Sequence, residues 1–237
     1  MVGLTISTLA HLDAAGLGGV HFIDLRVLRS FNLGVPVQMK KPTTKNPYKQ
    51  NNLFRGEAGN FDLNACVGTN GGPYDFHDYA RGYVRAGIVL VENAATCDNP
   101  VDILVYPIAY CFRHAIELYL KYLSTNLPSL WDEPGNMKQT HKLLDNWAFV
   151  KGYLCRAKQL DNDGTLIAQA ERTLTDFVEI DPTGETFRFP ADRSGNLFLQ
   201  NTWLINVVVL GTAMEELGDI LDFWSFETNE ILQNKHL

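Results

Sequence analysis

Apolar positions recur at helical spacing through most of the chain after Pro73. Apolar or aromatic residues three and four positions apart, starting at Tyr79, predict a helix over about residues 75–96. Asp98-Asn99-Pro100 ends this pattern, because the residue before a proline is turned away from helical geometry. The same reasoning predicts further helices over about 102–124, 141–154, 163–180 and 200–224. The pattern therefore predicts a mostly α protein built on four or five packed helices.

The first part of the chain shows no such period. Residues 1–37 mix short apolar runs with glycines, which predicts an irregular and partly β N-terminal arm. Residues 38–73 are rich in Pro, Gly, Asn and Lys and predict a long, locally basic loop, either simply solvated or in contact with RNA. We therefore predict three regions: 1–73 as the N-terminal region, 74–224 as the helical bundle and 225–237 as a C-terminal tail.

The last predicted helix is apolar on nearly all sides over Leu204–Leu210. A helix of this kind lies in the middle of a bundle or at an interface between subunits. The sequence leaves both possibilities open.

One face of the second predicted helix is polar. With Arg113 set at zero and about 100° per residue, Glu117 falls near 40°, Tyr110 near 60°, Lys121 near 80° and His114 near 100°. Apolar residues fill most of the remaining circumference. The stripe is either a solvated face with i,i+4 ion pairs or a partly buried group of charges enclosed by neighbouring helices. Its narrowness favours the buried alternative.

Other polar residues are candidates for the same site. The charge of Arg113 beside His114 is expected to lower the pKa of His114, which keeps its imidazole neutral and able to act as a base. His141, at the start of the next predicted helix, is either a second candidate base or a structural residue. Arg188 stands between Phe187 and Phe189, and alternation would turn both rings to the core and leave the guanidinium on the other side. Arg193 follows in the same loop.

Composition narrows the range of functions. The chain is 46% hydrophobic and 20% charged, which is typical of a globular protein, and its formal net charge is −7. That charge argues against a general nucleic-acid coat, although a small RNA-cleaving pocket remains compatible with it.

No secretory signal is visible and the longest apolar run, Trp203–Met214, is too short to span a bilayer. Four scattered cysteines fit a reducing compartment. We therefore predict a cytoplasmic protein that does not bind membranes.

The usual cofactor and hydrolase signatures are missing from the sequence. It contains no GxxxxGK[ST], GxGxxG, GxSxG or HExxH segment. We therefore predict no cofactor and no metal site.

Four segments resemble a group of mostly uncharacterised bacterial proteins related to HEPN domains (higher eukaryotes and prokaryotes nucleotide-binding). They are YDFHDYARGYVRAG, DILVYPIAYCFRHAIELYLK, THKLLDNW and FRFPADRSGN, in this order within residues 74–222. The resemblance implies a bundle of four or five helices, commonly a homodimer, with roles in phage defence or toxin–antitoxin systems. Active HEPN ribonucleases carry an Arg followed four to six residues later by a His, and no Arg in this chain has a His at that spacing.

The stripe and the resemblance together suggest a metal-independent ribonuclease. In this hypothesis His141 or His114 takes a proton from a ribose 2′-OH, and Glu117 orients the base. Arg113 and Arg188 hold the phosphate, and the substrate-binding residues are Tyr110, Lys121 and Arg193. The alternative is a non-catalytic module that binds RNA, a nucleotide or a partner protein of a defence complex, or that serves as a structural subunit.

Overall fold

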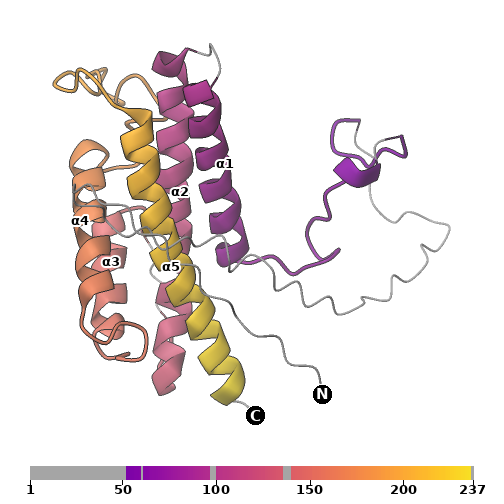
Figure 1. The fold of residues 1–237 in the computed structure, drawn as a ribbon, viewed down its shortest axis with the longest axis vertical. Coiled ribbons are helices and arrows are strands. Elements are labelled where there is room, and N and C mark those ends of the chain that lie inside the picture. Colours follow the sequence, from indigo (N-terminus) through magenta and orange to yellow (C-terminus); the bar gives the residue numbers. More distant parts are fainter. Residues whose placement is uncertain (1–51, 60, 97–99, 136–139, 236–237) are drawn as a thin grey trace, which may run out of the picture. The chain divides into compact units, whose positions relative to one another are not determined.

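The computed structural model describes residues 52–59, 61–96, 100–135 and 140–235. These residues form five α-helices and two short 3₁₀ helices, η2 and η3 (Figure 1). Their bounds are Phe61–Leu63 (η2), Phe76–Thr96 (α1), Val101–Asn126 (α2), Leu127–Trp131 (η3), Leu143–Leu154 (α3), Thr165–Ile180 (α4) and Val207–Lys235 (α5). The predicted mostly helical bundle is confirmed, and α1 to α4 match their predicted ranges to within two residues at each end.

The chain divides into two compact units, residues 1–57 and 58–237. The boundary between these units falls inside the predicted N-terminal region. Cys66 and Val67, which follow it, line a hollow together with residues of α1. The predicted β arm, residues 1–37, lies outside the described residues, as do the lysines of the basic loop (Lys40, Lys41, Lys45 and Lys49). Of that loop's named cations the structure describes Arg55, which pairs with Glu57 at 3.8 Å.

Helix α5 differs most from its prediction. It begins at Val207 and not near residue 200, because the Asn206 side chain accepts hydrogen bonds from the backbone N–H groups of Val208 and Val209 and so caps the first turn. It also continues to Lys235, so most of the predicted tail is helical. Ser225 and Thr228 are fully buried there, each donating its hydroxyl to a carbonyl one turn earlier.

Helix α2 is the centre of the bundle. It contacts α1, α3, α5 and η3, while α3 and α4 pack on one another and α4 also contacts α5 (Figure 1). Its side chains Ile108, Phe112, Tyr119, Leu120 and Leu123 are almost completely buried. Burying side chains of this size stabilises the fold by roughly 1.5–3 kcal/mol each. A helix surrounded in this way has few positions left for a solvated polar face.

Trp224 connects the α5 side of the core to the α3–α4 side. Its ring is fully buried and stacks on Trp147 of α3 with 6.1 Å between ring centroids. Its indole N–H donates to the carbonyl of Leu160, in the segment between α3 and α4, at 3.2 Å. No helix within the described ranges is long and apolar enough to cross a membrane.

The close approach of α1 and α2 leads to a first prediction. A Cβ built on Gly87 of α1 would lie 2.7 Å from the ring of Phe112 on α2. We expect Gly87→Ala to lower the free energy of unfolding by about 1–3 kcal/mol, because the rigid ring must shift. Urea denaturation followed by circular dichroism measures this.

Gly82 is the matched control, since it lies in the same helix and a Cβ there meets nothing within 4 Å. Gly82→Ala should raise the free energy of unfolding by up to ~1 kcal/mol through helix propensity alone. Equal changes at the two positions would contradict the packing of α1 on α2.

Candidate functional site

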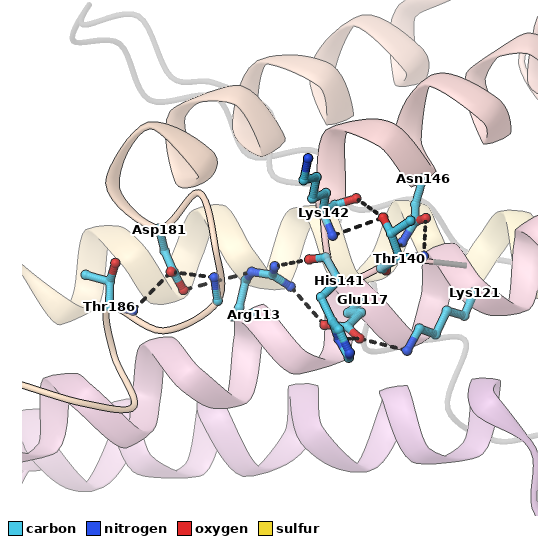
Figure 2. A network of polar contacts seen from close by, with 10 residues as sticks. Arg113, Glu117, Lys121, Thr140, His141, Lys142, Asn146, Asp181 and Thr186 are labelled. Atoms are coloured by element: carbon cyan, nitrogen blue, oxygen red, sulfur yellow. Dashed lines mark hydrogen bonds and ion pairs between the residues drawn. The ribbon is translucent and has the colours of Figure 1, made fainter. Parts of the chain in front are cut away.

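The polar stripe of α2 is buried, which decides between the two sequence-based interpretations. Arg113 is 3% exposed and Glu117 is 7% exposed, while the Lys121 side chain is 18% exposed. Two segments cover the stripe: residues 140–142 before α3, and the loop that follows α4 from Asp181 (Figure 2). The stripe is therefore an enclosed group of charges and not a solvated helix face.

The guanidinium of Arg113 has a partner on each of three segments. Its Nη1 donates to Glu117 Oε2 at 3.2 Å, one turn along α2, and its Nη2 donates to the backbone carbonyl of His141 at 2.6 Å. Its Nε lies 3.9 Å from Asp181 Oδ2, and this Nε is buried without a hydrogen-bond partner. Arg113 thus fixes the segment before α3 and the loop after α4 onto α2.

Glu117 links the buried charges to the surface. Its Oε2 accepts a hydrogen bond from Arg113 Nη1, whereas its Oε1 lies 2.8 Å from Lys121 Nζ and 2.9 Å from His141 Nδ1. Because the carboxylate only accepts, His141 donates its Nδ1–H, and the other ring nitrogen, Nε2, is left as the acceptor. The His141 side chain is 83% exposed. The result is a solvent-exposed imidazole oriented by a buried carboxylate.

Asp181 organises the loop after α4. It is 1% exposed, and its Oδ1 accepts the backbone N–H groups of Gly184 at 2.8 Å and Thr186 at 3.2 Å. Gly184 has a φ of +81°, and a Cβ there would lie 3.2 Å from Arg113 Nη2. Glycine is suited to this position both by its backbone conformation and by the nearby guanidinium.

The charges of the network act on one another through a partly desolvated environment. Burial lowers the pKa of Arg113, while Asp181 and Glu117 act in the opposite direction. Burial by itself raises the pKa of Glu117, but the hydrogen bonds from Lys121 and His141 and the charges of Lys121 and Arg113 outweigh it, so that pKa lies below its ordinary value. Glu117 is therefore ionised at neutral pH.

The other sequence candidates form a separate cluster. The ring of His114 meets Tyr83 edge-on at 4.5 Å between centroids and lies parallel to Tyr110 at 5.8 Å. The Arg188 guanidinium lies 5.7 Å from the centroid of Tyr110. The predicted lowering of the His114 pKa is confirmed, although its largest cause is burial, with Lys121, Arg113 and Arg188 adding to it and Glu117 opposing it. The structure therefore divides the candidates into an ion network and an aromatic cluster.

The flanks of Arg188 differ from their prediction. Phe187 is buried and packs on Phe177, as expected, but Phe189 is 49% exposed. Alternation fails because residues 185–189 form a turn and not a strand: the N–H groups of Arg188 and Phe189 both donate to the carbonyl of Glu185. Arg193 is exposed in the next turn and has no contact with either cluster within the described residues.

The sequence-based reasoning missed two groups of residues. Asp181 is not among the candidates named from the sequence, although an Asp that begins an Asp-Pro-Thr-Gly segment is a typical acceptor for backbone N–H groups. His77 was also missed: its Nε2 lies 2.7 Å from Asp222 Oδ1, which also accepts from the hydroxyl of Tyr119 at 3.1 Å. No pattern within one segment identifies that pair, because α1 and α5 supply one residue each.

Among the described residues, no group of three or more His, Cys, Asp or Glu side chains is placed to hold a metal ion. Comparisons of the chain with protein-family models, with curated proteins and with solved structures found no match. The class of protein is therefore defined by the fold and the site: a helical bundle in which a buried Arg–carboxylate network orients an exposed histidine.

Removing Arg113 tests the network. Arg113→Met would leave Asp181 buried without a cation and would remove one of the two cations that pair with Glu117, so we expect the free energy of unfolding to fall by about 3–5 kcal/mol. Lys151→Met is the control, because the Lys151–Glu171 pair is partly exposed and such pairs contribute only about 0–1 kcal/mol. Urea denaturation of both variants measures the difference. A small and equal loss in both would contradict the structural role of Arg113.

The lowered pKa of Glu117 predicts a pH dependence. Ionised Glu117 stabilises the fold above its ordinary pKa of 4.5, and this stabilisation is lost as the pH falls through the lower pKa of the folded state. We expect the free energy of unfolding to fall less steeply below about pH 4.5 in Glu117→Gln than in the unmodified chain. Denaturation series at several pH values measure both slopes, and equal slopes would refute the assignment.

Proposed function

We propose that this chain is a HEPN-like, metal-independent endoribonuclease that acts as an effector in a bacterial phage-defence or toxin–antitoxin system. One observation carries the proposal: the exposed imidazole of His141 is hydrogen-bonded through Nδ1 to Glu117, which is itself buried and held by Arg113. A histidine oriented by a buried carboxylate is the usual arrangement of a general base.

The reaction assigned to this arrangement is an intramolecular transesterification of RNA. His141 Nε2 accepts the proton of a ribose 2′-OH, and the 2′ oxygen attacks the adjacent phosphorus. The bond from phosphorus to the 5′ oxygen of the next nucleotide breaks, that oxygen takes a proton from water, and the exposed His141 imidazolium returns its proton to solvent. The products are a 2′,3′-cyclic phosphate and a 5′-hydroxyl. The imidazolium formed in the first step is stabilised by the adjacent Glu117 carboxylate.

Lys121 is the cation best placed to attract the phosphate. Its ammonium and the His141 imidazole contact the same carboxylate oxygen of Glu117, so they lie side by side, and the Lys121 side chain remains partly exposed. Lys142 is exposed next to His141 in the chain. Developing charge on phosphate oxygens is stabilised by such positioned cations.

Arg113 takes a different role in the proposal from the one assigned by sequence. It is too deeply buried to clamp a phosphate, and its donors are directed at Glu117 and the carbonyl of His141. We therefore assign Arg113 as a positioning residue. Arg113 and His141 do not have the HEPN spacing in the sequence. In the fold, however, Arg113 donates to the His141 carbonyl and both side chains bind Glu117, which supports the nuclease interpretation.

A second candidate is a non-catalytic module that binds a partner protein or a second copy of the chain. It is favoured by large apolar side chains that are exposed around the start of α5: Trp203 at 92%, Leu204 at 93% and Val209 at 68%. Surfaces of this kind are typical of interaction sites. In this alternative the buried ion network serves only to hold α3 and α4 on α2.

The nuclease proposal predicts metal-independent cleavage. In the presence of EDTA, the purified chain should cut single-stranded RNA into fragments ending in 2′,3′-cyclic phosphates, detected by gel electrophoresis and mass spectrometry. His141→Ala should lower the rate by about 10²–10⁴-fold, the usual contribution of a general base. His114→Ala should leave most of the activity, because His114 contacts aromatic rings and has no hydrogen bond to Glu117 among those the structure shows.

Circular dichroism of both variants establishes that they fold. Cleavage that survives in folded His141→Ala but not in His114→Ala would move the base to His114. Absence of cleavage by the unmodified chain, together with a stable complex with a partner protein, would favour the binding module.

A further inference from the structure

A second feature of α2 has no part in the ion network. Residues Tyr106, Pro107, Tyr110, Phe187, Arg188 and Phe189 line an open hollow of about 390 Å³. Small-molecule sites have volumes of roughly 300–1,000 Å³ and combine apolar walls with a few polar groups. Most of the lining here consists of flat rings, and its one charged group is a guanidinium.

The rings form a ladder along one face of α2. Tyr106, Tyr110 and His114 follow one another at i, i+4 and i+8, so they lie above one another on successive turns. The planes of Tyr110 and His114 are within 9° of parallel. Tyr106 is 45% exposed, and Phe189, which lines the same hollow, is 49% exposed. Aromatic side chains exposed to this extent suit a planar aromatic ligand, which gains by stacking.

Arg188 supplies the positive charge. Its guanidinium lies 5.2 Å from the ring centroid of Phe189 and 5.7 Å from that of Tyr110, and no carboxylate of the described residues pairs with it. The turn that carries Arg188 is held by buried Phe187 and by two hydrogen bonds to the carbonyl of Glu185. The side chain thus projects from an anchored turn and has its donors available for an anion.

We propose that this hollow binds a nucleotide, with the base stacked on Tyr106 and Phe189 and a phosphate oxygen bound by Arg188. Binding of a nucleotide follows from the hollow alone. Only the assignment of that nucleotide to a single-stranded RNA rests on the proposed ribonuclease function. Tyr110 and Glu117 are two turns apart on α2, roughly 10 Å at 1.5 Å per residue. Neighbouring nucleotides of one strand can span that distance, so the hollow holds the strand beside the nucleotide that is cleaved.

The test uses a probe that the proposed chemistry cannot cut. A fluorescein-labelled, single-stranded 2′-O-methyl oligoadenylate has no free 2′-OH, and its affinity for the unmodified chain is measured by fluorescence anisotropy at low salt. Tyr106→Ala and Arg188→Gln should each weaken binding roughly tenfold, since loss of one stacking contact has an effect of this order. Both side chains are exposed, so neither change disturbs the core.

Two matched variants control for general effects. Tyr79→Ala removes an exposed tyrosine that lies on α1 outside the hollow, and Arg172→Gln removes the same charge from an exposed position on α4. Both should bind within twofold of the unmodified chain. Failure of the unmodified chain to bind the probe, or equal weakening in all four variants, would overturn the proposal.

A displacement measurement distinguishes a free nucleotide from an RNA strand as the ligand. A comparison of binding with cleavage distinguishes failure of the nucleotide site from failure of the nuclease proposal. Displacement of the probe by adenosine 5′-monophosphate would assign the hollow to free nucleotides as well, and lack of displacement would assign it to a strand. If binding depends on Tyr106 and Arg188 but unmodified RNA is not cleaved, the nuclease proposal fails and the nucleotide site stands. If RNA is cleaved through His141 while Tyr106→Ala and Arg188→Gln bind and cleave normally, the nucleotide site fails.

Discussion

The burial of one positive charge, the guanidinium of Arg113, determines how the helices of this bundle are held around α2. A cation that is 3% exposed is tolerated only when anions and carbonyl oxygens replace the lost water. Glu117 supplies one carboxylate from the same helix, Asp181 supplies another from the loop after α4, and the carbonyl of His141 completes the set. The positions of the segment before α3 and of the loop after α4 therefore depend on this one side chain.

The same requirement creates the candidate site. Glu117 uses one carboxylate oxygen to neutralise the buried guanidinium and the other to bind Lys121 and His141, so a single residue joins the interior to the surface. Because His141 is fixed at its backbone by Arg113 and at its ring by Glu117, its exposed imidazole has a defined orientation. Preorganisation of this kind is what a general base requires.

Helix α2 carries both proposed parts of an RNA site, separated by two helical turns. Its N-terminal half presents aromatic rings beside Arg188, and its middle presents the Glu117–His141 pair. The turn bearing Arg188 and the loop bearing Asp181 belong to the same stretch between α4 and α5. One connection thus closes the ion network and forms a wall of the hollow, so the two proposed sites share a common scaffold.

Local sequence determined the helices, since the apolar period predicts α1 to α4 and the narrow polar face of α2 without knowledge of any partner. It also identified Arg113, Glu117, Lys121 and His141 as members of one candidate site, but it assigned Arg113 to phosphate because periodicity does not reveal which segments cover a helix face. The contact of Asp181 with Arg113, the hydrogen bond between His141 and Glu117 and the exposure of Phe189 are seen only in the tertiary structure. These outcomes depend on contacts between residues far apart in the chain, and a repeat pattern within one segment carries no information about them.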